Sequence, residues 1–383
     1  MFDSKKLDSY FDERNTFVAR RHKKSAFTFS WNRFIRLGFP CIAAALLGLM
    51  VVLPNIKKSV DIENNITLPR KNEMEKLHVE QVVMNSTDKK NRVSTVWSDN
   101  MDELEVGSDE IKISSPRAEI PSDNGLIKIS SDIGFVNQKT KVLRLKDNVK
   151  IIDEKGNSVN TSDATYEFEK EYGYGDDEVQ AEGNWGTLTA EKFTYDKNSG
   201  VLTLIGKTVI ETTNGTLISH NQTKYFQNED KTESEGKAMV KKDDKTLYAD
   251  KITNYFSGGA KKELKKTEAV GNVEIVTPKG RVKGNRADYN MNTGAAEVFG
   301  NVNIITEKGV AKGSHAVYDS KSNTVDLYGD VVLEQGNNFM RGHHAHTDLN
   351  TSISTMKADK TQGARVSGTF YNKRKAKNGE KTK

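Results

Sequence analysis

Cysteine and proline are both scarce in this chain of 383 residues. Its single cysteine, Cys41, excludes an intramolecular disulfide and any metal site built from several cysteines. Only 6 prolines accompany 29 glycines, which favours an ordered chain with many turns over a proline-rich disordered one. Hydrophobic residues make up only 35% of the chain. We therefore expect a thin core between few layers of strands.

The excess of positive charge is confined to the two ends of the chain. Residues 1–36 contain nine basic and four acidic residues, and residues 373–383 contain six basic and one acidic. Since the whole chain has a net charge of +5, the body between these ends has a net charge of −5. A mildly acidic body does not attract the phosphate backbone of nucleic acids. We therefore predict no nucleic-acid partner.

Long hydrophobic runs are absent except for one near the N-terminus. The seventeen residues from Leu37 to Leu53 include no charged side chain, and as a helix they would span about 25 Å. Basic residues concentrate before the run, which places the N-terminus in the cytoplasm. A cleaved signal peptide is the rival interpretation, but no small-residue cleavage site follows the run. We predict a basic cytoplasmic segment at 1–33, a transmembrane helix at 34–54 and a polar linker at 55–75.

Motifs for catalysis or metal binding are also lacking. No H-E-x-x-H motif is present, and the segment "GVLTLIGKT" has five residues between its glycines where a phosphate-binding loop has four. His344 and His346 share one strand face, but a repeat described below assigns both to ordinary strand positions. The acidic pair Asp176 and Asp177 is typical of a solvated loop. We predict no enzymatic activity, no metal and no cofactor.

The chain does contain a repeat with a period of 29 residues. "GNRADY" begins at Gly284, "GSHAVY" at Gly313 and "GHHAHT" at Gly342. Each motif is preceded by a run of alternating apolar and polar residues and a turn such as "TPKG" or "TEKG", and is followed by a second polar turn. Such a unit is too short for a crossover helix. It therefore encodes two antiparallel strands and two turns.

Looser copies of this unit extend upstream, starting at Asp147, Gly206 and Gly236. A stack of such units buries one face of each unit on its neighbours and needs no large core. We predict an all-β fold, an elongated antiparallel β-jellyroll of repeated short strands, preceded by one transmembrane helix. A parallel β-helix is the rival architecture, but the hairpin-like turns argue against it. Alternation alone does not distinguish a filled core from an apolar trough that is open to a ligand.

Two segments resemble known families. With its N-terminal anchor, "VVMNSTDKKNRVSTVWSDNMDELEV" and "GLIKISSDIGFVNQKTKVLRLKDNVKII", the first half resembles the LptC family of lipopolysaccharide export proteins. The second half, with "AVGNVEIVTPKGRVKGNRADYNMNTG" and "VFGNVNIITEKGVAKGSHAVYD", resembles the LptA (OstA-like) periplasmic bridge protein. These families usually form separate chains, and here both occur in one. We predict an LptC-like β-jellyroll at 76–212, an LptA/OstA-like β-jellyroll at 213–365 and a basic tail at 366–383.

The resemblance implies a function in lipopolysaccharide transport. The chain would be anchored in the inner membrane, bind the lipid A acyl chains of lipopolysaccharide in an apolar groove in the periplasm, and pass them toward the outer membrane. Its implied partners are the permease subunits of an inner-membrane ABC transporter, and an outer-membrane assembly protein or further LptA-like subunits joined by β-strand addition. The alternatives are a membrane-tethered β-solenoid scaffold or adhesin without lipid cargo and, third, a glycan-cleaving β-helix enzyme, for which the sequence lacks clustered acids.

The predicted lipid-binding residues are apolar side chains at inward positions of the strands. In the first half they are Leu143, Leu145, Val149, Ile151, Leu202 and Leu204. In the second half they are Val273, Ile275, Tyr289, Val298, Val302, Ile304, Tyr318, Leu327, Val331 and Leu333.

Overall fold

The computed structural model describes residues 76–370, apart from residues 88–90, 123–124, 185, 213–214, 258–263, 352 and 359–364. The segments predicted at 1–33, 34–54 and 55–75 lie outside the described residues. All regular secondary structure in the described part is β-strand. A search of these residues finds no membrane-spanning helix.

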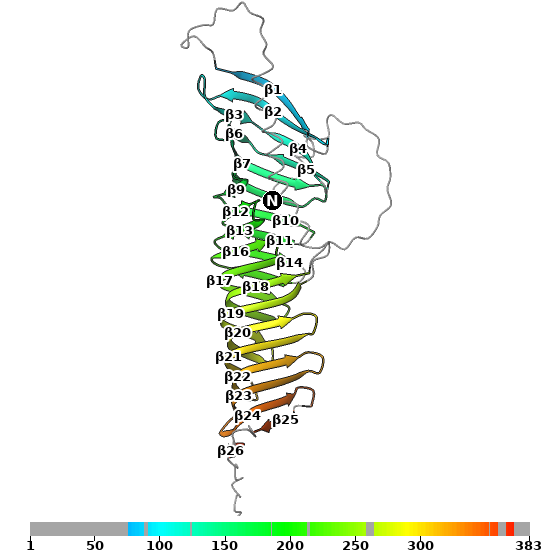
Figure 1. The fold of residues 1–383 in the computed structure, drawn as a ribbon, viewed down its shortest axis with the longest axis vertical. Helices are drawn as coiled ribbons and strands as arrows, with labels where there is room; N and C mark the ends of the chain where they lie inside the picture. The colour runs from blue at the N-terminus through cyan, green and yellow to red at the C-terminus, as the bar shows by residue number, and fades with distance from the viewer. Residues whose placement is uncertain are drawn as a thin grey trace, which may run out of the picture.

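The described strands are antiparallel and join in one sheet of 26 strands that are stacked along a single long axis (Figure 1). The predicted all-β antiparallel fold is confirmed. The strands of the first half are β1 His78–Thr87, β2 Val93–Glu103, β3 Glu110–Ser114, β4 Arg117–Ser122, β5 Gly125–Ser130, β6 Ile133–Asn137, β7 Val142–Asp153, β8 Ser158–Glu167, β9 Tyr172–Gly175, β10 Val179–Gly183, β11 Gly186–Ala190, β12 Lys192–Asp196, β13 Val201–Ile205 and β14 Thr208–Thr212.

The strands of the second half are β15 Gly215–Ser219, β16 Gln222–Phe226, β17 Lys231–Lys242, β18 Lys245–Phe256, β19 Leu264–Thr277, β20 Gly280–Asn290, β21 Ala295–Thr306, β22 Gly309–Asp319, β23 Thr324–Gln335, β24 Asn338–Asp348, β25 Ile353–Lys357 and β26 Ser367–Thr369. They include an uninterrupted run of long strands, from β17 to β24. The last two strands, β25 and β26, pair with different parts of β24, so the sheet continues past residue 365.

The sheet is folded into two layers because its long strands bend. One half of β17 pairs with β16 and the other half pairs with β15. We call the ladder that continues β16 layer A and the ladder that continues β15 layer B. In the first half, short strands such as β13 and β14 form the two layers separately, and β13 pairs with β16 while β14 pairs with β15. Both layers therefore continue without a break from the first half into the second.

In the alternate strands β17, β19, β21 and β23, the bend is made by two consecutive residues with positive φ. In β21 they are Gly300 at +74° and Asn301 at +52°, and the strand register shifts between Phe299 and Val302. Glycine and asparagine tolerate this left-handed region better than other residues do. The same pair recurs 29 residues away on either side, in β19 and β23. The repeated "GN" and "GD" of the sequence therefore mark the edge where layer A turns into layer B.

Two separate hydrophobic cores lie between the layers. The first contains buried side chains from Val82 to Tyr225, and the second contains buried side chains from Ala238 to Ala345. The second core is built largely of alanine and valine, with partly buried aliphatic side chains packed against it. The expected thin core is therefore present, and in the second half it consists mainly of small side chains.

Candidate functional site

An unbroken row of apolar residues follows layer B from one end of the sheet to the other. Each residue of the row is paired directly with the next one on the neighbouring strand. We call this row the apolar strip, and it consists of Met84, Val96, Ala118, Ile129, Ile151, Val159, Ala181, Leu188, Ile210, Leu217, Val240, Leu247, Ile275, Val282, Ile304, Ala311, Leu333 and Met340.

The two ends of the apolar strip differ in exposure. From Met84 to Ile210 all of its side chains are buried. From Leu217 to Met340 all are partly exposed, and most of them pack against the second core. The strip is therefore covered in the first half and accessible along one side in the second half.

A second row runs along layer A, on the other side of the bends from the apolar strip. This row, which we call the tyrosine row, consists of Leu143, Tyr166, Gly173, Tyr195, Leu202, Tyr225, Thr232, Asn254, Thr267, Tyr289, Ala296, Tyr318 and Val325. In the first half it is buried, with Leu202 only 2% exposed, whereas Tyr289 in the second half is 38% exposed. Both rows thus open in the second half.

The predicted lipid-binding residues divide into three groups in the structure. Four lie on the apolar strip, namely Ile151, Ile275, Ile304 and Leu333. Four lie on the tyrosine row, namely Leu143, Leu202, Tyr289 and Tyr318. The others are buried between the layers, closer to the bends, and are Leu145, Val149, Leu204, Val273, Val298, Val302, Leu327 and Val331. All six candidates of the first half are buried.

Several strip residues lie outside the predicted set, which drew its aliphatic side chains from the first strand of each repeat. Val282, Ala311 and Met340 lie on the second strand and are themselves 29 residues apart. Their spacing of 29 residues was therefore a signal in the sequence that they occupy equivalent positions. Leu217 and Val240 belong to the looser copies, where the sequence repeat is too weak to align them.

Polar side chains replace the apolar interior where the two cores meet. We call this group the polar waist, and it consists of Thr208, Ser219, Thr223, Thr232, Ser234, Asn254 and Thr267. The hydroxyls of Ser219 and Thr223 are 2.8 Å apart, and that of Thr223 donates to Ser234 at 3.1 Å, with all three side chains buried. Thr267 donates to the Asn254 amide oxygen at 2.8 Å. The buried hydroxyls therefore satisfy one another.

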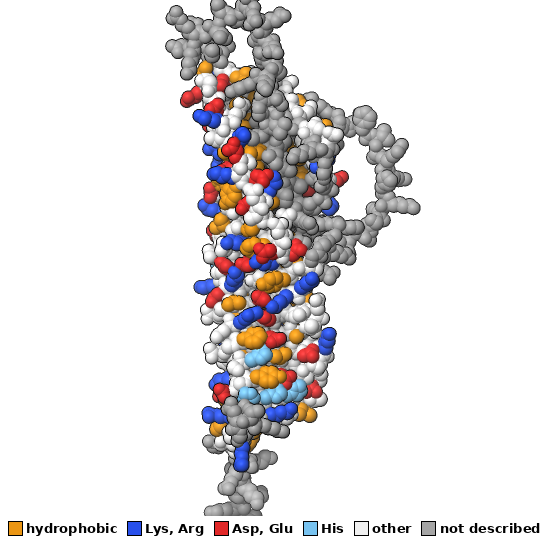
Figure 2. Space-filling view, viewed as in Figure 1, with side chains coloured by type: hydrophobic (Ala, Val, Ile, Leu, Met, Phe, Trp, Pro, Cys, Tyr) orange, Lys and Arg blue, Asp and Glu red, His pale blue; other side chains and the backbone are white. Residues whose placement is uncertain are grey.

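Stacked aromatic and histidine rings and a group of ion pairs lie on the outer face of layer A in the second half. Phe299 stacks on His315 at 4.5 Å between ring centres, and Tyr328 stacks on His344 at 4.6 Å. His315 and Tyr328 are also stacked, at 5.7 Å. Figure 2 shows histidine side chains among apolar ones in the lower part of the molecule. Because the ring faces cover one another, this row stiffens the layer and does not offer an open aromatic platform.

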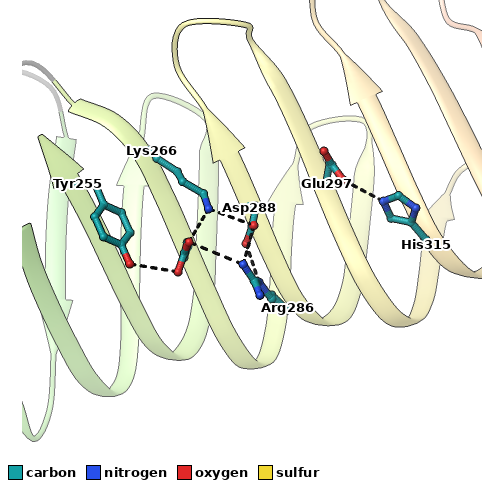
Figure 3. A network of polar contacts seen from close by, with 7 residues as sticks. Tyr255, Lys266, Arg286, Asp288, Glu297 and His315 are labelled. Carbon is teal, nitrogen blue, oxygen red and sulfur yellow. Dashed lines mark hydrogen bonds and ion pairs between the residues drawn. The ribbon is translucent and has the colours of Figure 1, made fainter. Parts of the chain in front are cut away.

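A network of charges lies beside the stacked rings (Figure 3). Arg286 donates to both carboxylate oxygens of Asp288 at 2.8 Å, and Lys266 lies 3.4 Å from the same carboxylate. Burial raises the pKa of Asp288, but the hydrogen bonds from Arg286 and the charge of Lys266 outweigh it and lower the pKa below its ordinary value. Such bidentate pairs stabilise the folded layer.

Two of the histidines noted in the sequence share one aspartate. His344 Nε2 is 2.7 Å and His346 Nδ1 is 2.9 Å from the same oxygen of Asp326. Burial raises the pKa of Asp326, but the two histidine hydrogen bonds hold it below its ordinary value. Among the described residues, no group of three or more His, Cys, Asp or Glu side chains is arranged to hold a metal.

Comparisons with known proteins match both halves of the chain. The family model described as lipopolysaccharide-assembly, LptC-related matches residues 40–212, and the model described as LptA/(LptD N-terminal domain) LPS transport protein matches residues 217–315. A search of curated proteins found no match. Among solved structures the chain is similar to LptH, the LptA-homologous periplasmic component of the lipopolysaccharide transport device of Pseudomonas aeruginosa. That similarity has 13% sequence identity and a TM-score of 0.21 and covers 41% of this chain and 94% of the other. This chain therefore joins an LptC-related region to a region of the LptA/LptD N-terminal type.

Proposed function

We propose that this protein is a periplasmic bridge that binds lipopolysaccharide by its acyl chains and passes it from the inner membrane toward the outer membrane. The observation that supports this most directly is the apolar strip, which runs unbroken through both family regions. An apolar path across an aqueous compartment needs that continuity, because every gap exposes the alkyl chain to water.

The energetics indicate why a continuous strip is needed. Burying a methylene group stabilises by about 0.8 kcal/mol, so an acyl chain of about a dozen methylenes gains roughly 10 kcal/mol from a full apolar cover. Half-exposed side chains such as Ile275, Ile304 and Leu333 leave apolar surface for such a chain to cover. The described residues include no nucleotide-binding motif, so forward movement requires work from a partner.

The ends of the sheet supply surfaces for the proposed partners. Among the described strands, β1 pairs only with β2, and β25 pairs only with β24. An edge strand with free backbone groups can accept a strand from another protein. We assign the permease subunits of an ABC transporter to one end, and an outer-membrane assembly protein or a further LptA-like subunit to the other. The proposed anchor at 34–54 would place the chain in the inner membrane.

Photo-crosslinking at two adjacent residues tests the proposal. Ile304 lies on the apolar strip, whereas its neighbour Ile305 faces away and is 37% exposed. A photo-crosslinking amino acid in place of Ile304 should label lipopolysaccharide in cells that export it, as judged by immunoblot against lipid A. The same amino acid in place of Ile305 is the matched control and should give no label. Equal labelling at both positions, or none at either, contradicts the proposal.

One observation favours a second function, a membrane-tethered β-solenoid scaffold or adhesin without lipid cargo. All six candidate residues of the first half are buried, as expected of a sealed core. Purification of the full chain in the absence of detergent separates the two functions. Co-purifying lipid supports the bridge, and a chain that is free of lipid supports the scaffold.

A further inference from the structure

The interior changes character between the two cores. The first core ends at Tyr225 and the second begins at Ala238. Along the tyrosine row the residues after Tyr225 are Thr232, Asn254 and Thr267, and the row then returns to Tyr289. Nearer the bends, Thr223 is paired with Ser234. Layer A is therefore polar along the tyrosine row throughout the waist, although Ile252 and Ala269, nearer the bends, belong to the second core.

Layer B contributes Thr208 and Ser219 to the waist near the bends, but it is apolar farther from them. Its apolar strip passes the waist through Leu217, Val240 and Leu247, each paired directly with the next. Leu217 packs against the first core, whereas Val240 and Leu247 pack against the second. All three side chains are partly exposed. The two apolar interiors are thus joined by one row of side chains on one wall.

The side chains of the polar waist form hydrogen bonds with one another in the interior. Its buried hydroxyls bond to one another in a chain from Ser219 through Thr223 to Ser234. Asn254 donates to Thr232 at 3.4 Å and accepts from Thr267. A wall of hydroxyl and amide groups that already bond to one another gains little from contact with an alkyl chain, because it offers the chain little apolar surface to cover.

We propose that acyl chains cross from the LptC-related region to the LptA/LptD-type region along layer B alone, over Leu217, Val240 and Leu247. This inference rests on the proposed transport function and specifies where the acyl chains pass between the two regions. The polar waist makes the crossing one-sided, so these three residues decide whether an alkyl chain passes between the two halves.

Matched pairs of crosslinking positions on single strands test the inference. Val240 and Thr232 both lie on β17, and Leu247 and Asn254 both lie on β18. In the full chain, in cells exporting lipopolysaccharide, photo-crosslinkers at Val240 and Leu247 should label lipid at least about tenfold more than those at Thr232 and Asn254, the ratio expected for one lost apolar contact. Ile304, further along the strip, is the reference position.

A blocking variant provides the second arm. Leu247→Asn should lower lipid labelling at Ile304 by about tenfold, whereas the adjacent outward substitution Tyr248→Asn should leave it unchanged. Leu247→Met keeps the apolar side chain and should retain labelling even if Leu247→Asn proves poorly folded.

The outcomes separate this inference from the proposed function. If the positions on layer A and layer B label lipid equally while Ile304 is labelled, the one-sided crossing is wrong and the bridge function stands. Undiminished labelling at Ile304 in a folded Leu247→Asn variant also overturns the crossing and leaves the bridge function in place. Loss of labelling at Ile304 in the Leu247→Met variant does the same. Absence of any label at Ile304 in the unblocked chain overturns the bridge function, and the crossing with it.

Discussion

Val298 fills the space that a side chain on Gly284 would occupy. A Cβ atom at Gly284 would lie only 2.4 Å from Cγ1 of Val298 on the neighbouring strand. The same relationship recurs at Gly313 with Leu327 and at Gly342 with Met356. The repeated glycine that begins "GNRADY" and its copies is therefore a packing requirement, which lets a large side chain lie over the next strand.

We expect Gly284→Ala to lower the free energy of unfolding by about 1–3 kcal/mol, because the added methyl group overpacks the second core. Chemical denaturation of the full chain measures this. Val298→Ala in the same chain removes the opposing methyl groups, so the double variant should be less destabilised than the sum of the single variants. Strict additivity contradicts the packing explanation.

Tyr166 offers a substitution that should stabilise the protein. Its side chain is 1% exposed, and its hydroxyl has no hydrogen-bond partner among the described residues. Burial also raises the pKa of this hydroxyl. Removing an unsatisfied buried polar group avoids its desolvation cost. We therefore expect Tyr166→Phe to raise the free energy of unfolding by about 1 kcal/mol, as measured by thermal or chemical denaturation.

The control for Tyr166→Phe is a tyrosine whose hydroxyl is used. Tyr255 donates to Glu268 at 3.3 Å. Tyr255→Phe should therefore lower the free energy of unfolding by about 0.5–1.5 kcal/mol. A stabilising effect at both positions would point to a general preference for phenylalanine in this sheet.

Acid should weaken the second half through its paired carboxylates. The pKa values of Asp288 and Asp326 are lowered in the folded protein. The stability they contribute is fully present above the unfolded-state pKa of about 3.9 and is lost as the pH falls through the folded-state values. We expect Asp326→Asn to reduce the dependence of the unfolding free energy on pH below about 4, as measured by denaturation at several pH values.

Asp330→Asn is the matched control for Asp326→Asn. Asp330 lies on the same strand, is exposed, and occupies a bend position that asparagine also tolerates. An equal change in pH dependence from both variants would show that the contacts of Asp326 with His344 and His346 have no special effect.

The two cores should respond separately to core substitutions. Leu143 is buried in the first core and Val302 in the second. Leu143→Ala should destabilise its own core by about 2–5 kcal/mol and speed hydrogen exchange in β3 to β13 while leaving β19 to β24 unchanged. Val302→Ala should show the reverse pattern. Faster exchange throughout the sheet in both variants contradicts separate cores and indicates one cooperative unit.

Much of the architecture could be predicted from the sequence because its signals are local. The period of 29 residues, the turns and the alternation predicted antiparallel hairpins, and the strands formed from β19 to β24 agree with them. The residues of the second strand of each repeat, such as Val282 and Met340, had the same period and were available to the same reasoning. Their membership of the apolar strip nevertheless depends on which residue of the next strand they face.

The sequence by itself determined the class of fold, the repeat and the inward alternation, since these follow from backbone geometry within a few residues. Only the tertiary structure decided that Leu217 is paired with Val240, that the strip is buried in one half and open in the other, and that hydroxyls gather between two cores. Each of these depends on the register between strands and on the cover provided by the opposite layer. The physical reason is that alternation states which face a side chain is on, whereas the elements packed around that face determine whether water reaches it.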